Sequence, residues 1–158
     1  TDGHVDNILH IAGPAEVLLT WCDDPADPMY KICRECLVTL EAERDARGRA
    51  FNVHKLPLPG PLFLSEREAA GIEASSAGMK RSAGERLAAS YANFLLTNNR
   101  LVFPLLDPAH DEEAREIFQR VFPGHTVIGV DGREIILGGG NIHCITQQIP
   151  AARQGERQ

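Results

Sequence analysis

Residues 7–56 read NILHIAGPAEVLLTWCDDPADPMYKICRECLVTLEAERDARGRAFNVHKL, and this stretch decides the fold class. Its first part is strand-like over residues 7–11 and again over residues 16–20. Between them, glycine followed by proline at residues 13–14 is typical of a turn. The pattern therefore predicts two consecutive strands.

A helix and a third strand are expected to follow. Asp27 and Pro28 are typical of a helix start, because Asp caps free backbone N–H groups and Pro fits the first helical position. The next apolar residues recur at helical spacing and form one stripe: Met29, Ile32, Cys33, Cys36, Leu37 and Leu40. Gly48 is expected to end the helix, and residues 51–56 alternate as a strand. The order strand, strand, helix, strand predicts an α/β fold.

The same order recurs in the second half of the chain. Residues 91–96 and 101–103 are strand-like, and Asn98-Asn99 forms the turn between them. A second Asp-Pro pair at residues 107–108 predicts another helix start, and residues 126–130 are expected to form the closing strand.

The two units also align in sequence, since residues 6–9 (DNIL) match residues 91–95 (YANFL). A third copy is expected to begin at residues 141–145 (NIHCI). Repeats of about 50 residues are typical of stacked or radially arranged units, and about three or more are usually needed for stability. Two units and a fraction leave an open edge, which predicts a fragment or half of an assembly.

Residues 1–150 are expected to form one α/β domain with a long internal connection from Pro57 to Glu85. Within this connection, residues 66–72 are expected to form one or two helical turns. A connection of this length inside a compact domain is usually functional or mobile. The polar residues 151–158 are predicted to be a disordered tail.

The charge and hydrophobicity of the chain limit the kinds of molecule that it can bind. The 158 residues carry 16 Lys and Arg against 22 Asp and Glu, a net charge of −6. This balance argues against nucleic acid or an anionic membrane surface as the main partner and favours a cationic ligand. The apolar runs are too short to cross a bilayer, and nothing resembles a signal peptide. Four cysteines are too few for a disulfide scaffold, so a reducing, cytoplasmic location is expected.

The stretch from Gly138 to Cys144 (GGGNIHC) is the most informative for chemistry. Three successive glycines after an apolar strand allow the backbone to approach a ligand closely. A thiol directly after such a turn is placed where a substrate could lie. The pattern alone leaves open whether Cys144 is a nucleophile or a buried structural thiol, because reactivity depends on its surroundings.

His4 and Asp6 pair a base with a carboxylate two residues apart. On a strand, both side chains would point to the same face and converge on one pocket. A cysteine needs a neighbouring base or cation to become a thiolate, so this pair could activate Cys144 if the repeats bring the three together. The alternative is an exposed histidine beside a solvated aspartate.

Cys33 and Cys36 form a CxxC motif, which raises the possibility of a zinc or redox site. Both sulfurs are predicted to lie on the apolar stripe of the helix, and no second ligand pair follows at zinc-binding spacing. Core packing is therefore the preferred interpretation. A zinc module built from Cys22, Cys33 and Cys36 is the distant alternative.

Three stretches together resemble the agmatine deiminase family of the guanidine-modifying (pentein) superfamily: residues 1–7 (TDGHVDN), 86–94 (RLAASYANF) and 138–148 (GGGNIHCITQQ). The resemblance covers nearly the whole chain except its tail. It implies a five-bladed α/β propeller of ββαβ repeats, of which about two and the start of a third are present. It also implies hydrolysis of agmatine to N-carbamoylputrescine and ammonia in polyamine synthesis, without a cofactor or metal.

The resemblance implies a role for each matching residue. Cys144 would be the nucleophile that attacks the guanidinium carbon and forms a covalent amidino-cysteine intermediate. His4 would be the acid/base, protonating the departing ammonia and later activating water. Asp6 would hold the guanidinium through paired N–H···O bonds.

Family members are about twice as long as this chain, and their remaining guanidinium-binding carboxylates come from an N-terminal half. The resemblance therefore implies that this chain supplies the nucleophile-bearing C-terminal half and needs that N-terminal half, or self-association, to complete the fold. Two alternatives stay open: deimination of another guanidine such as peptidyl-arginine, and a non-catalytic fragment that associates through its open repeat edge.

Overall fold

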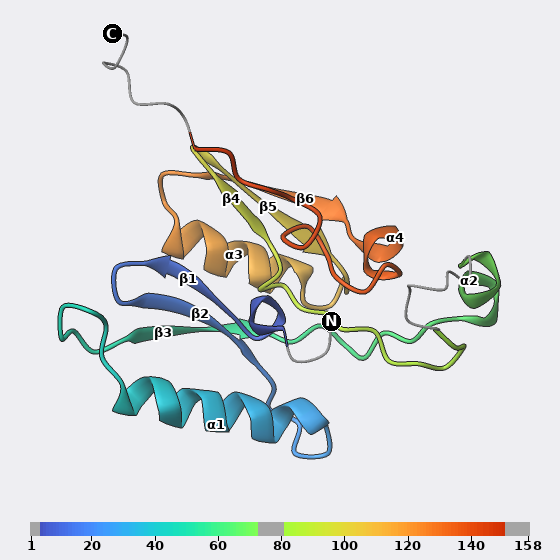
Figure 1. Cartoon of the computed structure of the whole chain (residues 1–158), viewed down its shortest axis with the longest axis horizontal. Helices are drawn as coiled ribbons and strands as arrows, with labels where there is room; N and C mark the ends of the chain where they lie inside the picture. The colour runs from blue at the N-terminus through green and yellow to red at the C-terminus, as the bar shows by residue number, and fades with distance from the viewer. Residues whose placement is uncertain (1–3, 73–80, 151–158) are drawn as a thin grey trace, which may run out of the picture.

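The computed structural model describes residues 4–72 and 81–150, which form a mixed α/β structure (Figure 1). Its elements follow one another in the order η1 (Val5–Asn7), β1 (Leu9–Gly13), β2 (Glu16–Trp21), α1 (Pro28–Ala42), β3 (Asn52–Pro57), α2 (Glu66–Gly71), β4 (Leu95–Thr97), β5 (Arg100–Leu105), α3 (Asp111–Val121), β6 (Thr126–Asp131) and α4 (Arg133–Ile136).

The first unit is a three-stranded sheet in the order β1-β2-β3. Strands β1 and β2 pair antiparallel, whereas β2 and β3 pair parallel from Glu16 opposite Asn52 to Trp21 opposite Pro57. A parallel pair needs a long crossover, and α1 provides it. Asp27 caps this helix by accepting a hydrogen bond from the backbone N–H of Met29 at 2.8 Å. The predicted helix start is therefore confirmed.

The second unit repeats this arrangement in the order β4-β5-β6. Strands β4 and β5 pair antiparallel around the turn at Asn98-Asn99, and β5 pairs parallel with β6 across the helix α3. Two ββαβ units are thus present, as the sequence predicted. Within the described residues they form two separate three-stranded sheets, and neither these sheets nor the segments between them make a closed ring.

Helix α3 of the second unit lies between the two sheets and joins their cores. It contacts β3 of the first sheet and β6 of its own sheet, and Figure 1 shows it between them, while α1 lies on the outer face of the first sheet. The shared core takes Leu18 and Leu56 from the first sheet and Phe94, Phe103 and Phe118 from the second unit. Two units so joined are expected to fold cooperatively.

Phe118 lies at the centre of this core, fully buried, with its ring centroid 5.0 Å from that of Phe94 and 5.1 Å from that of Phe103. Replacing Phe118 by Ala is expected to lower the free energy of unfolding by about 3–5 kcal/mol, since it removes buried apolar area and leaves a cavity. Phe63, half exposed outside this cluster, is the matched control, and its replacement by Ala should change stability by less than about 1 kcal/mol. Urea unfolding measures the stability of both variants. Similar losses of unfolding free energy in the two would contradict a shared core around Phe118.

Several predicted boundaries are wrong. Residues 91–94 form a turn rather than a strand, so β4 is short and begins at Leu95. Likewise, residues 5–7 form a 3₁₀ turn before β1. Both turns carry buried asparagines that hydrogen-bond across the molecule, and these bonds replace a strand ladder.

The helix ends also differ from expectation. Helix α1 ends at Ala42, and Gly48 lies in the following turn with φ +77°. Helix α3 begins at Asp111, four residues after Asp107, because Asp107 caps the preceding turn by accepting from the N–H of Ala109. Residues 141–145, where a third copy of the unit is expected to begin, form a turn and no strand.

The connection from Pro57 to Glu85 packs against the second unit over its described part. The predicted helical turns are confirmed as α2, and Leu64 forms a small apolar cluster with Leu87 and Ile136 of α4. Glu68 of α2 also binds Arg133 of α4 through two 2.7 Å hydrogen bonds. Residues 73–80 of this connection and the tail 151–158 lie outside the described residues.

The Glu68–Arg133 pair is expected to make the attachment of α2 acid-sensitive. Hydrogen bonds from Arg133, and after them those from Ser65, lower the pKa of Glu68 from 4.5 to about 2. A lowered folded-state pKa stabilises the protein above pH ~4.5, and the gain is lost as the pH falls toward 2. Glu68→Gln keeps a side chain able to cap α2 but removes the charge.

We therefore expect Glu68→Gln to lower the melting temperature slightly at neutral pH, and the difference from the unaltered chain to vanish near pH 2. Glu116→Gln, the same change on the exposed face of α3, is the matched control and should have no pH-dependent effect. If Glu68→Gln changed the melting temperature by the same amount at every pH, the result would contradict a stabilising ion pair.

Candidate active site

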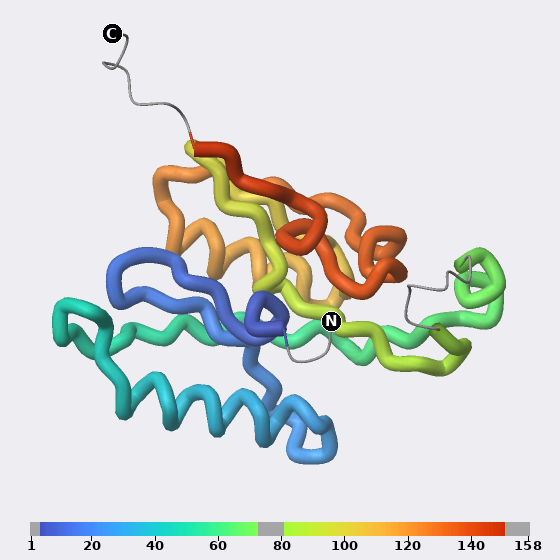
Figure 2. The backbone as a smooth tube through the Cα atoms, in the orientation of Figure 1, coloured from blue at the N-terminus to red at the C-terminus, as the bar shows by residue number. Residues whose placement is uncertain are grey.

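Three turns that are far apart in the sequence meet at one place. Asp6 lies on η1, Asn93 on the turn before β4, and Cys144 on the turn at residues 141–145. Figure 2 shows the blue coil of η1 close to the red turn at residues 141–145, and the Sγ of Cys144 is 3.1 Å from the Oδ2 of Asp6. The sequence repeats aligned these three segments, and the structure brings them together as turns.

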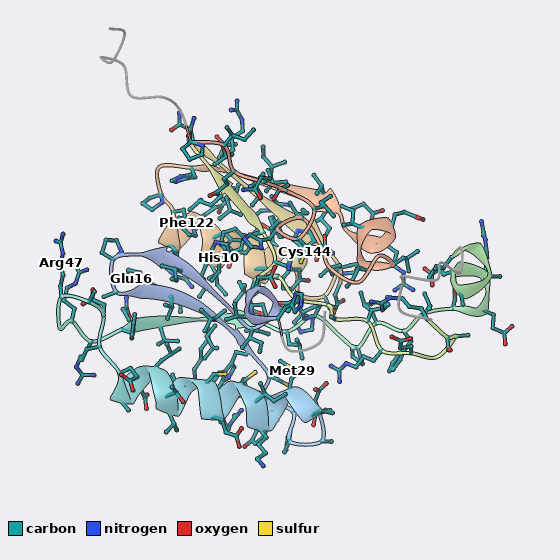
Figure 3. All side chains as sticks on the ribbon, viewed as in Figure 1. His10, Glu16, Met29, Arg47, Phe122 and Cys144 are labelled. Carbon is teal, nitrogen blue, oxygen red and sulfur yellow. The ribbon has the colours of Figure 1, made fainter. Side chains whose placement is uncertain are left out.

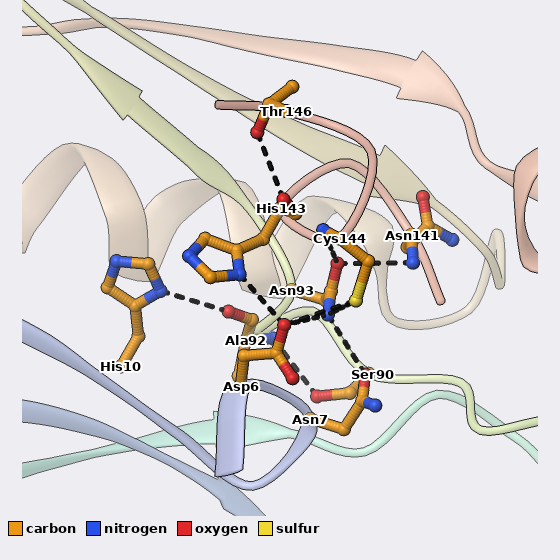
Figure 4. Close-up of polar contacts among 10 residues, drawn as sticks. All are labelled: Asp6, Asn7, His10, Ser90, Ala92, Asn93, Asn141, His143, Cys144 and Thr146. Atoms are coloured by element: carbon orange, nitrogen blue, oxygen red, sulfur yellow. Dashed lines mark hydrogen bonds and ion pairs between the residues drawn. The ribbon is translucent and has the colours of Figure 1, made fainter. Parts of the chain in front are cut away.

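Asp6 and Cys144 are in direct contact. The Oδ2 of Asp6 accepts hydrogen bonds from the Cys144 thiol at 3.1 Å, the Nδ2 of Asn93 at 3.0 Å and the Nδ1 of His143 at 2.8 Å (Figure 4). Because the carboxylate is the acceptor, the Nδ1 of His143 carries a proton. The thiol is exposed while the carboxylate is partly buried, so an approaching molecule reaches the sulfur first.

The charge of Asp6 is held by its neighbours. Burial alone would raise its pKa, but hydrogen bonds from Cys144 and His143 and the positive charges of His143 and His4 hold the pKa below 3.8. Its other oxygen, Oδ1, is buried and makes no hydrogen bond to any residue that the structure describes. A buried carboxylate oxygen without a partner can accept a hydrogen bond from a ligand.

His4 lies next to this group but does not complete it. It is the residue before η1, and its exposed side chain lines a cavity of about 330 Å³ together with Asn7, Met29 and Arg86. Its imidazole makes no hydrogen bond within residues 4–72 and 81–150, although its charge acts on Asp6. The expected strand geometry of His4 and Asp6 is wrong, because both lie at a 3₁₀ turn.

Buried asparagines support the three turns. Asn7, Asn93 and Asn141 are each at least nine-tenths buried and occupy corresponding places in the three aligned segments. Asn93 donates to the Oδ1 of Asn7 at 3.2 Å and accepts from the backbone N–H of Asn141 at 3.1 Å. A hydrogen bond between Thr20 and Ser90 at 2.9 Å continues the network beneath them.

The glycine-rich stretch follows a short helix and not the expected strand. Residues 133–136 form the short helix α4 rather than a strand, and the glycines end it. The N–H groups of Gly138 and Gly139 bond to the carbonyls of Ile135 and Ile136 at 3.0 and 2.9 Å, and Gly139 has φ +104°. That conformation favours glycine, and it turns the chain back toward Cys144.

His10 and Cys144 lie where the two units face one another (Figure 3). The ring of His10 stacks on Phe94 with centroids 4.0 Å apart, and its Nδ1 lies 3.3 Å from the carbonyl oxygen of Ala92. Burial lowers the pKa of His10, which favours the neutral form of this imidazole. His10 therefore packs between the two units and holds β1 close to the turn at residues 91–94.

The CxxC motif lies on α1, away from these turns. Cys33 is fully buried and Cys36 is half-buried, and burial raises the pKa of both thiols. Raised pKa values oppose the thiolate form that metal binding requires. Among the described residues, no group of three or more His, Cys, Asp and Glu side chains is placed to hold a metal ion.

Residues 1–150 match the model of the Porphyromonas-type peptidyl-arginine deiminases. The chain belongs to this family. Its relatives include a "Putative agmatine deiminase" of Photobacterium profundum, 54% identical over 150 residues, which are 95% of this chain and 41% of the relative. A protein of the same name from Vibrio parahaemolyticus is 55% identical over 151 residues, 96% of this chain and 42% of its own.

Solved structures of agmatine deiminases share the fold of this chain over nearly all of its length. The agmatine deiminase of Enterococcus faecalis superposes with a TM-score of 0.86 at 36% identity, covering 95% of this chain and 41% of that one. The predicted relationship to agmatine deiminases is confirmed by these matches. The chain spans about two-fifths of the length of the curated relatives it matches.

Sequence reasoning assigned no function to Asn93 or His143, which the structure places in direct contact with Asp6. The repeat alignment held a signal for Asn93, since Asn recurs at residues 7, 93 and 141. None of the helices within the described residues has both the length and the apolar character needed to cross a bilayer.

Proposed function

We propose that this deiminase chain hydrolyses agmatine to N-carbamoylputrescine and ammonia, with Cys144 as the nucleophile, as a step of polyamine synthesis. One observation carries the proposal: an exposed thiol in contact with a carboxylate whose second oxygen is buried without a partner among the described residues. A guanidinium would bind this carboxylate through its N–H groups while its carbon faces the sulfur. Relatives named as agmatine deiminases support this choice of substrate.

The first half of the reaction replaces ammonia by sulfur. A guanidinium is stabilised by resonance and is a poor electrophile, so Asp6 holds it by charge-assisted hydrogen bonds while the Cys144 thiolate attacks its carbon. The C–S bond forms as the C=N π electrons move to nitrogen. His4 then gives a proton to the departing nitrogen, and the C–N bond breaks to release ammonia. An amidino-thioether remains on Cys144.

The second half restores the thiolate. Water attacks the same carbon, and His4, now neutral, takes a proton from it. The new tetrahedral adduct collapses: the C–S bond breaks with its electrons returning to sulfur, the hydroxyl proton passes to water, and the hydroxyl oxygen becomes the carbonyl of the ureido product. The sum is agmatine plus water giving N-carbamoylputrescine plus ammonia, with the protein unchanged.

The complete reaction needs more protein than these residues. We propose that the two ββαβ units are blades of a five-bladed propeller, completed by an N-terminal half or by self-association of this chain. The further guanidinium-binding carboxylates would come from that part. The net charge of −6 suits a doubly cationic substrate in this setting.

The family's description as peptidyl-arginine deiminases favours a second candidate substrate, arginine within a peptide. Competition separates the two: the completed protein is given agmatine and an arginyl peptide together, and ammonia and both ureido products are measured. We expect N-carbamoylputrescine to predominate. Peptidyl-citrulline as the main product would overturn agmatine as the substrate, and an absence of both products from folded protein would overturn the enzyme proposal.

A further inference from the structure

Asn93 links its own turn to the two other turns that meet at the candidate site. It is fully buried on the turn before β4, and its side chain lies between Asp6, Asn7 and Cys144 (Figure 4). Its Oδ1 accepts from the backbone N–H groups of Asn141 at 3.1 Å and Cys144 at 3.3 Å. Its own carbonyl accepts from the N–H of His143 at 3.3 Å. One residue therefore fixes the backbone of the cysteine turn.

The amide nitrogen of Asn93 has more acceptors than hydrogens. Its Nδ2 lies 3.0 Å from the Sγ of Cys144, 3.0 Å from the Oδ2 of Asp6 and 3.2 Å from the Oδ1 of Asn7. An amide NH₂ carries two hydrogens, so only two of the three contacts can be made fully at once. Which two depends on whether the sulfur acts as a donor or as an acceptor.

The protonation state of the Cys144 sulfur decides which two of the three contacts the Asn93 amide makes. As a thiol, Cys144 donates its own hydrogen to Asp6, and the two amide hydrogens can serve Asp6 and Asn7. As a thiolate, the sulfur has no hydrogen to give and becomes a charged acceptor at 3.0 Å from the amide. Hydrogen bonds to charged groups are stronger than those between neutral groups, so the amide would turn toward it.

We propose that Asn93 is a positioning residue that holds the Cys144 sulfur against Asp6 and donates a hydrogen bond to that sulfur once it is ionised. The importance of this contact for catalysis rests on the proposed function. The contact itself lies wholly within this chain. Asn93 would act through Cys144 and not on the substrate itself. It would stabilise the thiolate beside the carboxylate that otherwise opposes it.

Asn93→Asp tests this with little change of shape. Aspartate keeps an oxygen for the two backbone N–H groups but removes both amide hydrogens and brings a second acidic group beside Asp6. We expect alkylation of Cys144 by iodoacetamide at pH 7 to slow by about tenfold or more. The difference should shrink as the pH rises, because at high pH the sulfur is ionised in both proteins. Mass spectrometry of the Cys144 peptide separates this reaction from that of other cysteines.

Asn98→Asp makes the same change on the exposed β4–β5 turn and should leave the alkylation profile unaltered. A purely structural role for Asn93 would change the rate by the same factor at every pH, and that result would overturn the proposal. So would an unchanged profile. Alkylation needs no agmatine, so it decides this inference even where agmatine turnover fails and the proposed function with it.

A second measurement applies if Asn93→Asp does not fold. In the unaltered chain, the side-chain amide resonances of Asn93 are followed by NMR as the pH is raised. We expect a shift that coincides with the rise in Cys144 alkylation and is missing in Cys144→Ser. An amide that does not respond over that pH range, or responds equally in Cys144→Ser, would overturn the proposal.

Discussion

Cys144→Ser is expected to reduce agmatine turnover by the completed protein by about 10⁴-fold or more while leaving the fold intact. A serine hydroxyl has nearly the shape of the thiol and can still donate to Asp6, so the turn at residues 141–145 should keep its place. It is nevertheless far harder to ionise and a poorer nucleophile toward a guanidinium carbon. Initial rates of ammonia and N-carbamoylputrescine formation measure the effect.

Cys36→Ser is the matched control, because it makes the same change on α1 at a half-buried thiol outside the site. It should retain the activity of the unaltered protein. Turnover that survives Cys144→Ser, or that falls equally in both variants, would mean that Cys144 is not the nucleophile.

Asp6→Asn is expected to lower kcat/KM for agmatine by about 10²-fold, equivalent to about 3 kcal/mol of lost charge-assisted binding. The amide is nearly isosteric but carries no charge to hold the guanidinium. The contacts of Oδ2 with Cys144, Asn93 and His143 would also weaken. Because the guanidinium is bound before and during attack, KM should rise as well as kcat fall.

The same variant has an expected pH signature. The folded-state pKa of Asp6 lies below 3.8, so its charge stabilises the fold above that pH, and the gain is lost as the pH falls further. The difference in unfolding free energy between the unaltered chain and Asp6→Asn should be constant above pH ~4 and shrink in more acidic solution. Asp24→Asn, on an exposed turn, should show neither the kinetic nor the pH effect. Equal kcat/KM for Asp6→Asn and the unaltered protein would contradict guanidinium binding by Asp6.

The regular part of the fold was predictable from local patterns. Alternating strands, the Asp27-Pro28 helix start and the duplicated order of elements follow from side-chain periodicity and capping, which act over a few residues. The alignment of residues 6–9 with 91–95 also held, since both segments lie where a unit begins. Local rules were therefore sufficient to identify the two ββαβ units.

Local rules failed at the site itself. Residues 91–94 and 141–145 have strand-like composition, but buried hydrogen bonds between Asn93 and distant turns hold them in turn conformations. Such bonds join residues about 50 to 90 positions apart, and no short-range pattern reports them. For the same reason the sequence suggested His4 beside Cys144 but gave no warning that His143 would hold the carboxylate.

The most direct test of the account is to find the covalent intermediate. The completed protein is mixed with agmatine, quenched in acid during turnover, digested and analysed by mass spectrometry. We expect an adduct with the mass of agmatine less one ammonia on the peptide that contains Cys144, and we expect it to disappear as turnover ends. Steady formation of N-carbamoylputrescine with no adduct on Cys144, or with the adduct on another residue, would contradict the account.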